Sequence, residues 1–273
     1  EIPNILREIG RLREITFRAV GEGTGEAVDL DSFDDYYLHL FIWNPQKCEV
    51  VGAYRLGLSD RILARHGKRG FYTSSLFRYS SRFLYSIYPA IELGRSFIRA
   101  EYQRSFSPLM LLWKGIGQFV VRNPQYARLF GPVSISNAYH SLSQQLLVDF
   151  LSSNSFDWHL GRLVRPRNAW KPKNRLRPIW KKAEVEGIRS IEGISELVSV
   201  IEEDNKGMPI LLKQYLKLGG RMLGFNIDQK FNDCLDGLVL VDLHKTDTSV
   251  LERYMGKAGA ASFMAAGNAR KSA

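Results

Sequence analysis

The chain has 273 residues, with 45% hydrophobic and 24% charged residues and a net charge of +10. These values are ordinary for a folded globular protein, and the length suits one large domain or two small ones. No apolar run reaches the roughly 18 residues of a membrane-spanning helix. The two cysteines exclude a disulfide framework and a cysteine-rich metal site.

The first segment predicts a helix. Apolar residues recur at three- and four-residue spacing from Ile2 to Ala19, and four arginines lie among the first twenty residues, unlike in a signal peptide. We therefore expect a cytoplasmic protein. Because residue 1 is Glu, we also expect the chain to be a piece of a longer precursor.

A β-hairpin is predicted next. A Gly- and Asp-rich loop at 21–35 leads to an apolar run at 36–43, a turn at 44–47 and a second run at 48–58. Residues 61–86 mix aromatic residues, arginines and serines without a clear period, so they are left unassigned.

The middle of the chain predicts a strand, helix, strand, helix unit. The strands are expected at 90–98 and 129–136, and the helices begin at Ser107-Pro108, which suits a helix N-terminus, and at 141. Such a unit requires a right-handed crossover and a mixed or parallel sheet. The fold class is therefore α/β or α+β.

The last part of the chain begins with a basic stretch at 161–182, interpreted as a linker or a docking surface. Helices are predicted at 194–203 and 209–223, and a strand at 238–243. The last fifteen or so residues, rich in Ala and Gly, are expected to form a frayed tail.

Two charged residues lie in the strand at 90–98. Alternation places Glu92, Gly94 and Ser96 on one face of this strand and Arg95 on the other. A strand covered by helices is usually apolar, so each charge needs a partner. Either the two form an ion pair at the strand end, or Glu92 is an active-site base and Arg95 positions a substrate.

Other candidate residues flank this strand. The helix that begins at Ser107 directs free N–H groups at the loop containing Gln103 and Arg104, which suits a phosphate but also an ordinary buried helix. Four charged residues upstream read singly as solvated side chains: Arg18, Asp31, Asp34 and Arg55.

The order of these residues resembles a known family. The acyl-homoserine lactone synthases, which have the GNAT acyltransferase fold, carry Arg, Asp-x-x-Asp, Arg and Glu-x-x-Arg in this order. The GNAT-fold aminolipid synthases, ornithine lipid N-acyltransferases often labelled hemolysin-like, are closer still. Three segments carry that second resemblance: Glu92 to Ser96, Leu111 to Gly115 and Leu211 to Gly219.

The resemblance implies a GNAT-like fold, with a central mixed, twisted sheet flanked by helices and a C-terminal extension. It implies transfer of a (3-hydroxy) fatty acyl group from acyl carrier protein to the α-amine of ornithine or glycine, without a metal or a permanently bound cofactor. Related activities, acyl-homoserine lactone synthesis or acyl-CoA-dependent N-acylation, are the alternatives. Relatives are sometimes fused to an O-acyltransferase, which would suit a chain that starts at Glu1.

The same resemblance assigns roles to residues. Glu92, directly or through water, would remove the amine proton, and a strand N–H near Phe97 or Ile98 would hold the oxyanion. The substrate sites would be shaped by Arg18, Asp31, Asp34, Arg55, Arg95 and Ser96. The phosphopantetheine of the donor would lie along Phe97, Ile98, Gln103, Arg104, Ser105 and Ser107.

One departure bears on the donor. The usual GNAT loop, Gln/Arg-x-x-Gly-x-Gly/Ala, cradles the pyrophosphate of coenzyme A, whereas residues 103–108 contain neither glycine. A phosphopantetheine arm on a carrier protein presents one phosphate instead of three, so a less open cradle suffices. The departure favours acyl carrier protein over coenzyme A.

The basic stretch suits nucleic acid, an anionic membrane or an acidic carrier protein. Trp170 and Trp180 within it suit a lipid interface. No nucleic-acid-binding motif accompanies it, so we expect docking on acyl carrier protein first and peripherally on the inner membrane second, with a nucleic-acid-binding module as the alternative. Its basic residues are Arg162, Arg165, Arg167, Lys171, Lys173, Arg175, Arg177, Lys181 and Lys182.

The predicted organisation has four parts. A catalytic core at 1–160 is followed by the basic linker or docking segment at 161–190. Helices and a strand at 191–245 complete the domain, and 246–273 form a partly flexible tail.

Overall fold

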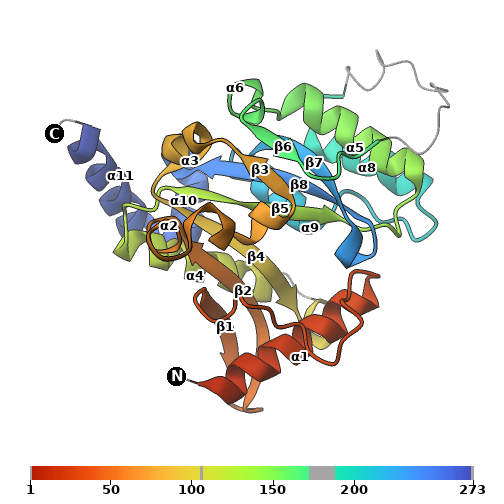
Figure 1. Ribbon diagram of the computed structural model, residues 1–273, viewed down its shortest axis with the longest axis horizontal. Helices are drawn as coiled ribbons and strands as arrows, with labels where there is room; N and C mark the ends of the chain where they lie inside the picture. Colours follow the sequence, from red (N-terminus) through yellow and green to blue (C-terminus); the bar gives the residue numbers. More distant parts are fainter. Residues whose placement is uncertain (1, 105–106, 172–187, 272–273) are drawn as a thin grey trace.

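The computed structural model describes residues 2–104, 107–171 and 188–271 (Figure 1). Its central sheet consists of β1 (Leu38–Asn44), β2 (Glu49–Leu58), β4 (Ala90–Ile98), β5 (Arg128–Ile135), β7 (Arg221–Asp228) and β8 (Cys234–Asp242). The strands lie in the order β1-β2-β4-β5-β8-β7. β4 and β5 are parallel and the other neighbours antiparallel, so the predicted α/β class with a mixed sheet is confirmed.

Helices cover both faces of this sheet. One face carries the larger part of the core, where Trp113 and Leu147 pack against strand residues such as Leu93. The helices of this face are α4 (Ser107–Arg122), α5 (Ser141–Asn154), α8 (Ile191–Ile201), α9 (Ile210–Lys217), α10 (Thr248–Met255) and α11 (Lys257–Lys271). In the described ranges, no helix is long and apolar enough to span a bilayer.

The opposite face is covered by shorter elements. Its helices are α1 (Pro3–Ala19), α2 (Ser59–His66) and α3 (Ser81–Ile87), with α6 (Trp158–Gly161) near the edge formed by β7. A ribbon of β3 (Phe77–Tyr79) and β6 (Val164–Pro166) packs beside them. Short 3₁₀ turns are η1 (Gly67–Gly70), η2 (Tyr72–Ser75), η3 (Ala100–Tyr102), η4 (Gln229–Phe231) and η5 (Leu243–Lys245).

Several predicted elements are confirmed. The N-terminal helix is α1, the hairpin is β1 with β2, and the strand, helix, strand, helix unit is β4, α4, β5 and α5. Local chemistry supports these boundaries: Pro3 opens α1, and the hairpin turns at Asn44, whose side chain accepts hydrogen bonds from Gln46 N and Lys47 N.

The C-terminal part differs from the prediction in three places. The helix expected at 209–223 ends at Lys217 because Gly219 adopts a φ of 81° and Gly220 N bonds back to Tyr215 O, after which β7 begins. The strand expected at 238–243 begins earlier, at Cys234. Residues 248–271, expected within a flexible tail, form α10 and α11 because Leu251 and Phe263 bury against α4 and its neighbours.

The described part of the basic stretch joins the sheet. β6 pairs with β3, and Asn168 and Trp170 form backbone hydrogen bonds with β7. These bonds make residues 164–170 part of the folded domain. Residues 172–187, which include Trp180 and most of the predicted docking lysines and arginines, lie outside the described residues.

Candidate active site

A bulge in β4 shapes the centre of the site. Ala53 lies opposite Phe97 and Arg55 opposite Gly94, so β4 contains one residue more than β2 across this interval. The extra residue is Arg95, whose φ is 50°. The predicted alternation is therefore wrong beyond Gly94: Glu92 and Arg95 both reach Tyr72 on the face of α1, whereas Ser96 lies beside Tyr54 on the face of α4.

The two parallel strands, β4 and β5, stop pairing shortly before this bulge. Pairing of β4 with β5 is confined to Ala90, Ile91 and Glu92. At Gly131 the strands approach so closely that a Cβ atom would lie 2.0 Å from Leu93 O, and Pro132, which has no N–H to donate, follows. Beyond it the sheet opens between β4 and β5.

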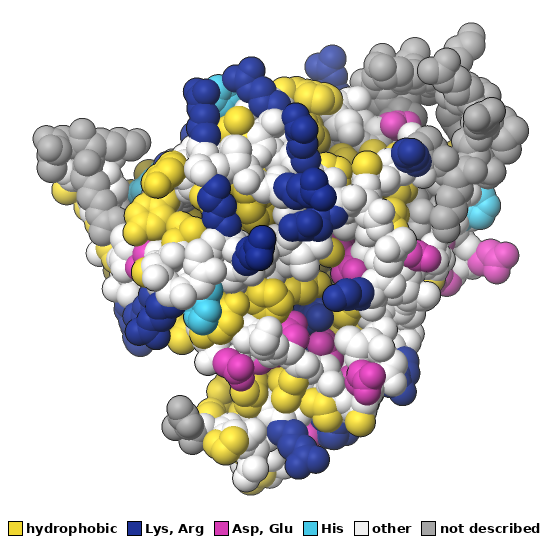
Figure 2. All heavy atoms as spheres, viewed as in Figure 1, with side chains coloured by type: hydrophobic (Ala, Val, Ile, Leu, Met, Phe, Trp, Pro, Cys, Tyr) yellow, Lys and Arg dark blue, Asp and Glu magenta, His cyan; other side chains and the backbone are white. Residues whose placement is uncertain are grey.

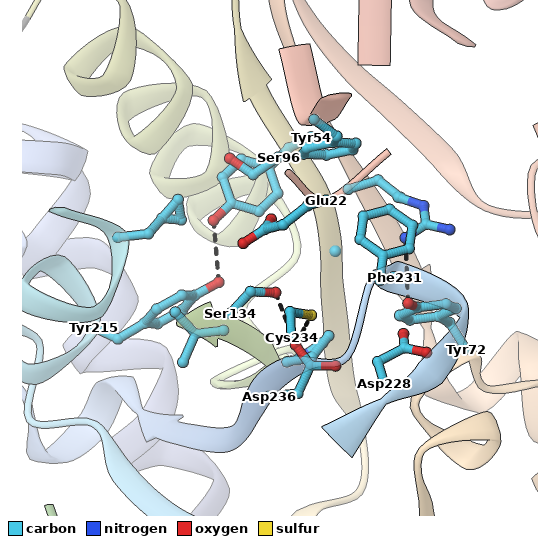
Figure 3. A pocket seen from close by; sticks show the side chains of 16 residues that line it. Glu22, Tyr54, Tyr72, Ser96, Ser134, Tyr215, Asp228, Phe231, Cys234 and Asp236 are labelled. Atoms are coloured by element: carbon cyan, nitrogen blue, oxygen red, sulfur yellow. Dashed lines mark hydrogen bonds between the residues drawn. The ribbon is translucent and has the colours of Figure 1, made fainter. Parts of the chain in front are cut away.

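A cavity of about 160 Å³ occupies this opening (Figure 3). Its walls come from both faces of the sheet. On the face of α4 and α9 they are apolar or carry hydroxyl groups: Tyr54, Ser96, Val133, Leu211 and Tyr215. On the opposite face they are mostly polar or aromatic: Phe17, Glu22, Tyr72, Arg95, Ser134, Asp228, Phe231, Cys234 and Asp236.

A buried network of charges supports the polar half of the cavity. Arg13 Nη1 lies 2.8 Å from Asp34 Oδ1, Arg55 Nη1 lies 2.6 Å from Asp31 Oδ1, and Arg55 also lies 3.2 Å from Asp34 Oδ2. Burial raises the pKa of Asp34, but the Arg13 and Arg55 guanidiniums outweigh it and lower that pKa overall. Three of the predicted residues, Asp31, Asp34 and Arg55, are thus brought together.

Arg95 connects this network to the cavity. Its Nε lies 3.1 Å from Asp29 Oδ2, and its Nη1 donates to Tyr72 O–H at 3.2 Å. The guanidinium stacks over the rings of Tyr72 and Phe231. Among the described residues that line the cavity, Arg95 is the single Lys or Arg.

Arg18, in contrast, lies apart from the network. Its side chain is 58% exposed and pairs with Glu14 at 2.6 Å, on a face of α1 that does not border the cavity. The network contains Arg13 instead, which precedes Arg18 on α1 and has a fully buried side chain. The sequence pointed to Arg18, whereas the structure places Arg13 in the network, because spacing alone does not show which face of α1 meets the sheet. A role of Arg18 in substrate binding stays a prediction.

Glu92 is buried next to the cavity but does not line it. Its Oε1 accepts hydrogen bonds from Thr73 N, at 2.8 Å, and Thr73 Oγ1, and its Oε2 accepts from Tyr72 N, at 3.0 Å, and Tyr37 O–H. Burial raises the pKa of Glu92 despite these bonds. The carboxylate therefore holds η2, and with it Tyr72, against the sheet.

Three further carboxylates line the polar half and were not singled out from the sequence. Glu22 follows α1, Asp228 ends β7, and Asp236 lies within β8 (Figure 3). Burial, together with neighbouring carboxylates, raises the pKa values of Glu22 and Asp236 to about 7. The alternation of Cys234, Asp236, Leu238 and Leu240 on one strand face was the available signal, but Asp236-Gly237 reads as a turn.

The residues predicted to bind the acyl donor do not all lie at the cavity. Arg99 N donates to Val51 O on β2, and neighbouring amides of a strand point in opposite directions, so the Phe97 amide faces β2 and the Ile98 amide faces away from it. Ser96 precedes these two residues, next to the bulge. The Phe97 side chain is buried under α1. Of these three residues, Ser96 lines the cavity.

The loop before α4 is on the surface. Gln103 Nε2 donates to Ile98 O at 2.7 Å, and Arg104 and Ser107 are exposed. Ser105 lies outside the described residues. Within the described ranges, no three His, Cys, Asp or Glu side chains are placed to hold a metal ion.

The chain is similar to known proteins. The acetyltransferase (GNAT) domain family matches residues 12–114. The chain is 32% identical over 260 residues to a glycine N(alpha)-acyltransferase of Phocaeicola vulgatus (89% of this chain, 77% of the relative). A glycine N(alpha)-acyltransferase of Bacteroides thetaiotaomicron is 32% identical over 259 residues (88% and 74%). An L-ornithine N(alpha)-acyltransferase of Rhodobacter capsulatus is 27% identical over 263 residues (91% and 90%). No solved structure has a significant match.

Proposed function

Since the chain belongs to the GNAT amino-acid N-acyltransferases and is an acyltransferase, we propose that it moves a fatty acyl group from acyl carrier protein to the α-amine of glycine. The product would be an N-acyl amino acid, the lyso form of an aminolipid. The observation that carries this proposal is the cavity that opens through the sheet, with an apolar and hydroxyl-lined half on one face and a charged half on the other.

This division suits two substrates that arrive from opposite faces. An acyl-phosphopantetheine arm is extended and largely apolar, and the half lined by Tyr54, Val133 and Leu211 would receive it. An amino acid is small and doubly charged, and the half containing Arg95 would receive it, with its carboxylate on the guanidinium. If the two substrates met in the opening between β4 and β5, the amine would lie beside the thioester carbonyl.

The reaction is a direct displacement. The neutral amine attacks the thioester carbonyl, the C–N bond forms, and the C–S bond breaks. The Ser96 N–H would stabilise the oxyanion, because Ser96 lines the cavity next to the bulge in β4. Tyr54 O–H and Tyr215 O–H lie 3.1 Å apart at the donor half. Because burial raises the pKa of Tyr54 to about 12, this pair would stay neutral. It would protonate the departing sulfur and take up the proton that the attacking nitrogen releases as the amide forms.

Glu92 would act in this scheme as a positioning residue. Its four hydrogen bonds hold Tyr72 in place, and Tyr72 in turn holds Arg95. A base acting through water is not needed where carboxylates already line the cavity.

The acceptor amino acid follows from the relatives and from the charges. Glycine comes first because two relatives at 32% identity are named for it. Ornithine is the second candidate because the cavity presents three carboxylates, which would also accommodate a second ammonium group.

A basic surface would bring the acidic carrier protein to the enzyme. Figure 2 shows Lys and Arg side chains gathered over the face that carries α3, β3 and β6. Arg78 lies directly opposite Arg165 in the β3–β6 ribbon, and both are exposed, as is Arg167. Like charges opposite one another are unfavourable without an anionic partner. Trp170 is half-buried against the core. Among the described residues, Tyr85 and Trp158 are the most exposed aromatic side chains and would be available to a membrane.

The test is a reaction with defined donors and acceptors. The protein would be incubated with 3-hydroxyacyl carrier protein or the matching acyl-CoA and a panel of amino acids, and the products identified by mass spectrometry. We expect N-acylglycine, with the carrier-bound donor used at a higher kcat/KM than acyl-CoA. Formation of no N-acyl amino acid from either donor would refute the proposal.

A further inference from the structure

The polar half of the cavity contains more negative than positive charge. We propose that Glu22 and Asp236 form a carboxylate pair that binds the ammonium group of the acceptor amino acid and removes its proton before attack. This inference rests on the proposed function and adds to it the residues that accept the proton and the charge state in which the substrate binds.

Asp236 lies in a buried polar row that crosses three strands. Its partners in register are Ser134 on β5 and Asn226 on β7. The Asp236 side chain belongs to a residue only 3% exposed, and its hydrogen-bond donors are the neutral Ser134 Oγ, at 2.7 Å, and Cys234 Sγ, at 3.7 Å. Within the described part of the chain, no ion pair joins Asp236 to a cation. A buried carboxylate in this state is costly until a cation arrives.

Glu22 reaches the same space from a different element. It lies in the loop after α1 and is half-buried, and Figure 3 shows Glu22 and Asp236 on opposite sides of Ser134. The two carboxylates are close enough that the charge of Asp236 contributes to the raised pKa of Glu22. No ion pair joins Glu22 to a described Lys, Arg or His either. An ammonium group between the two would supply the missing positive charge.

The other acidic groups are engaged elsewhere. Asp228 Oδ1 accepts from Lys230 N and caps η4, so this carboxylate stabilises the turn between β7 and β8. Glu92 holds η2. Asp29 is paired with Arg95. This leaves Glu22 and Asp236 as the carboxylates of the cavity that neither cap a turn nor pair with an arginine.

The proton transfer balances. One N–H bond of the ammonium breaks and an O–H bond forms on a carboxylate, leaving a neutral amine. The amine nitrogen then bonds to the thioester carbon, the C–S bond breaks, and the sulfur takes the second proton. Groups with pKa values near 7 suit this exchange at neutral pH.

Four titratable groups also line the cavity and face the pair: Arg95 from β4, Tyr72 from η2, Asp228 from β7 and Cys234 from β8. Tyr72 and Cys234 stay neutral because burial raises their pKa values. Arg95 favours the ionised pair, whereas Asp228 disfavours it. Because the two carboxylates interact, we expect the midpoints of their titration to belong to the pair and not to either residue alone.

The experiment compares Glu22→Gln and Asp236→Asn with two matched controls, Glu26→Gln and Asp233→Asn. Both control residues are exposed: Glu26 lies in the same loop as Glu22, and Asp233 directly precedes β8, the strand that contains Asp236. The value of kcat/KM for the amino acid would be measured from about pH 5.5 to about pH 10 with saturating acyl donor, and folding checked by thermal melting. The wild type should lose activity as pH falls through about 7.

Each cavity variant should lower kcat/KM at pH 7 by about 10² to 10⁴. Its deficit should shrink as pH rises, because the variant can use only amine that is already neutral, and the acidic limb should move toward the pKa of the free amino acid. The controls should superimpose on the wild type. If both variants keep the wild-type midpoint and rate, the inference is wrong.

Two outcomes remain distinct. A wild type that forms no N-acyl amino acid refutes the proposed function, whereas an active wild type with unaffected variants refutes the carboxylate pair alone. If Asp236→Asn does not fold, Glu22→Gln decides, since Glu22 is half-buried in a loop and its amide form leaves no buried ion pair broken.

Discussion

Two clusters of buried charge lie side by side in this protein, and they are balanced differently. The cluster under α1 contains three arginines and three aspartates at ion-pair distance: Arg13, Arg55, Arg95, Asp29, Asp31 and Asp34. Across the cavity, Glu22, Asp228 and Asp236 have no cation partner among the described residues. The matched cluster supports a conformation without a ligand, whereas the unmatched one needs a ligand to complete it.

The pKa values of the two clusters reflect this difference. The neighbouring guanidiniums lower the pKa of Asp34 against the effect of burial, so its charge stabilises the fold. Burial raises that of Asp236 to about 7, so its charge opposes the fold. A charge kept at the expense of stability in a cavity is typical of a functional group.

The largest effect is expected from breaking the matched cluster. Asp34→Asn would leave Arg13 and Arg55 short of a counter-charge in a buried position, so the free energy of unfolding should fall by about 3 to 5 kcal/mol. Because the pKa of Asp34 is lowered in the folded state, its contribution is present above its unfolded pKa, and the difference from wild type should shrink as pH falls below about 4.

Urea unfolding at several pH values measures this change. The neighbouring Asp35 is exposed, so Asp35→Asn is the matched control and should change stability by less than about 0.5 kcal/mol. Equal stability of the two variants would show that the network does not support the fold.

A smaller loss is expected at Glu92, between the two clusters. The Glu92 carboxylate accepts four hydrogen bonds, two on each oxygen. In Glu92→Gln an NH₂ group would face two of those four donors, so the free energy of unfolding should fall by about 1 to 3 kcal/mol. Turnover should fall because Tyr72 and Arg95 shift, but the midpoint of the pH–rate profile should stay near that of the wild type. Loss of the acidic limb in Glu92→Gln would instead make Glu92 the base. Exposed Glu203→Gln serves as control.

The unmatched cluster predicts a gain of stability. Asp236 has a folded pKa of about 7 and a much lower unfolded one, so its penalty on the folded state grows as pH rises between the two values and is complete above the folded one. Asp236→Asn should therefore be more stable than wild type by about 1 to 3 kcal/mol at pH 8 and unchanged near pH 4. Urea unfolding at the two pH values tests this, and a variant no more stable at pH 8 would contradict it.

Elements with a local sequence pattern could be predicted, whereas those that depend on distant pairing could not. Periodicity and turn residues gave α1, the first hairpin and the crossover from β4 to α5, because their patterns are local. The bulge at Arg95 was not predicted, because it depends on pairing between β4 and β2, which are distant in sequence. β7 was missed because the apolar spacing after Leu211 continues past the Gly219-Gly220 stop.

The site was predicted unevenly for the same reason. Asp31, Asp34 and Arg55 belong to a recognisable order of residues, and the structure brings them together. Glu22 and Asp236 belong to no pattern that a single sequence displays. Their place in the cavity follows from the separation of β4 and β5, which is a property of the whole sheet.

The smallest effect is expected at Arg18, and it tests which arginine of α1 belongs to the matched cluster. Glu14, its partner, is also held by Thr24 N, Thr24 Oγ1 and Gly25 N, so the carboxylate stays hydrogen-bonded without Arg18. A pair at i and i+4 whose cation is exposed contributes at most about 1 kcal/mol. Arg18→Ala should therefore unfold near the wild-type urea midpoint and keep kcat/KM within about twofold, whereas Arg13→Ala should approach the loss seen in Asp34→Asn. A large loss of activity in Arg18→Ala with stability intact would mean that Arg18 contacts a substrate from outside the cavity.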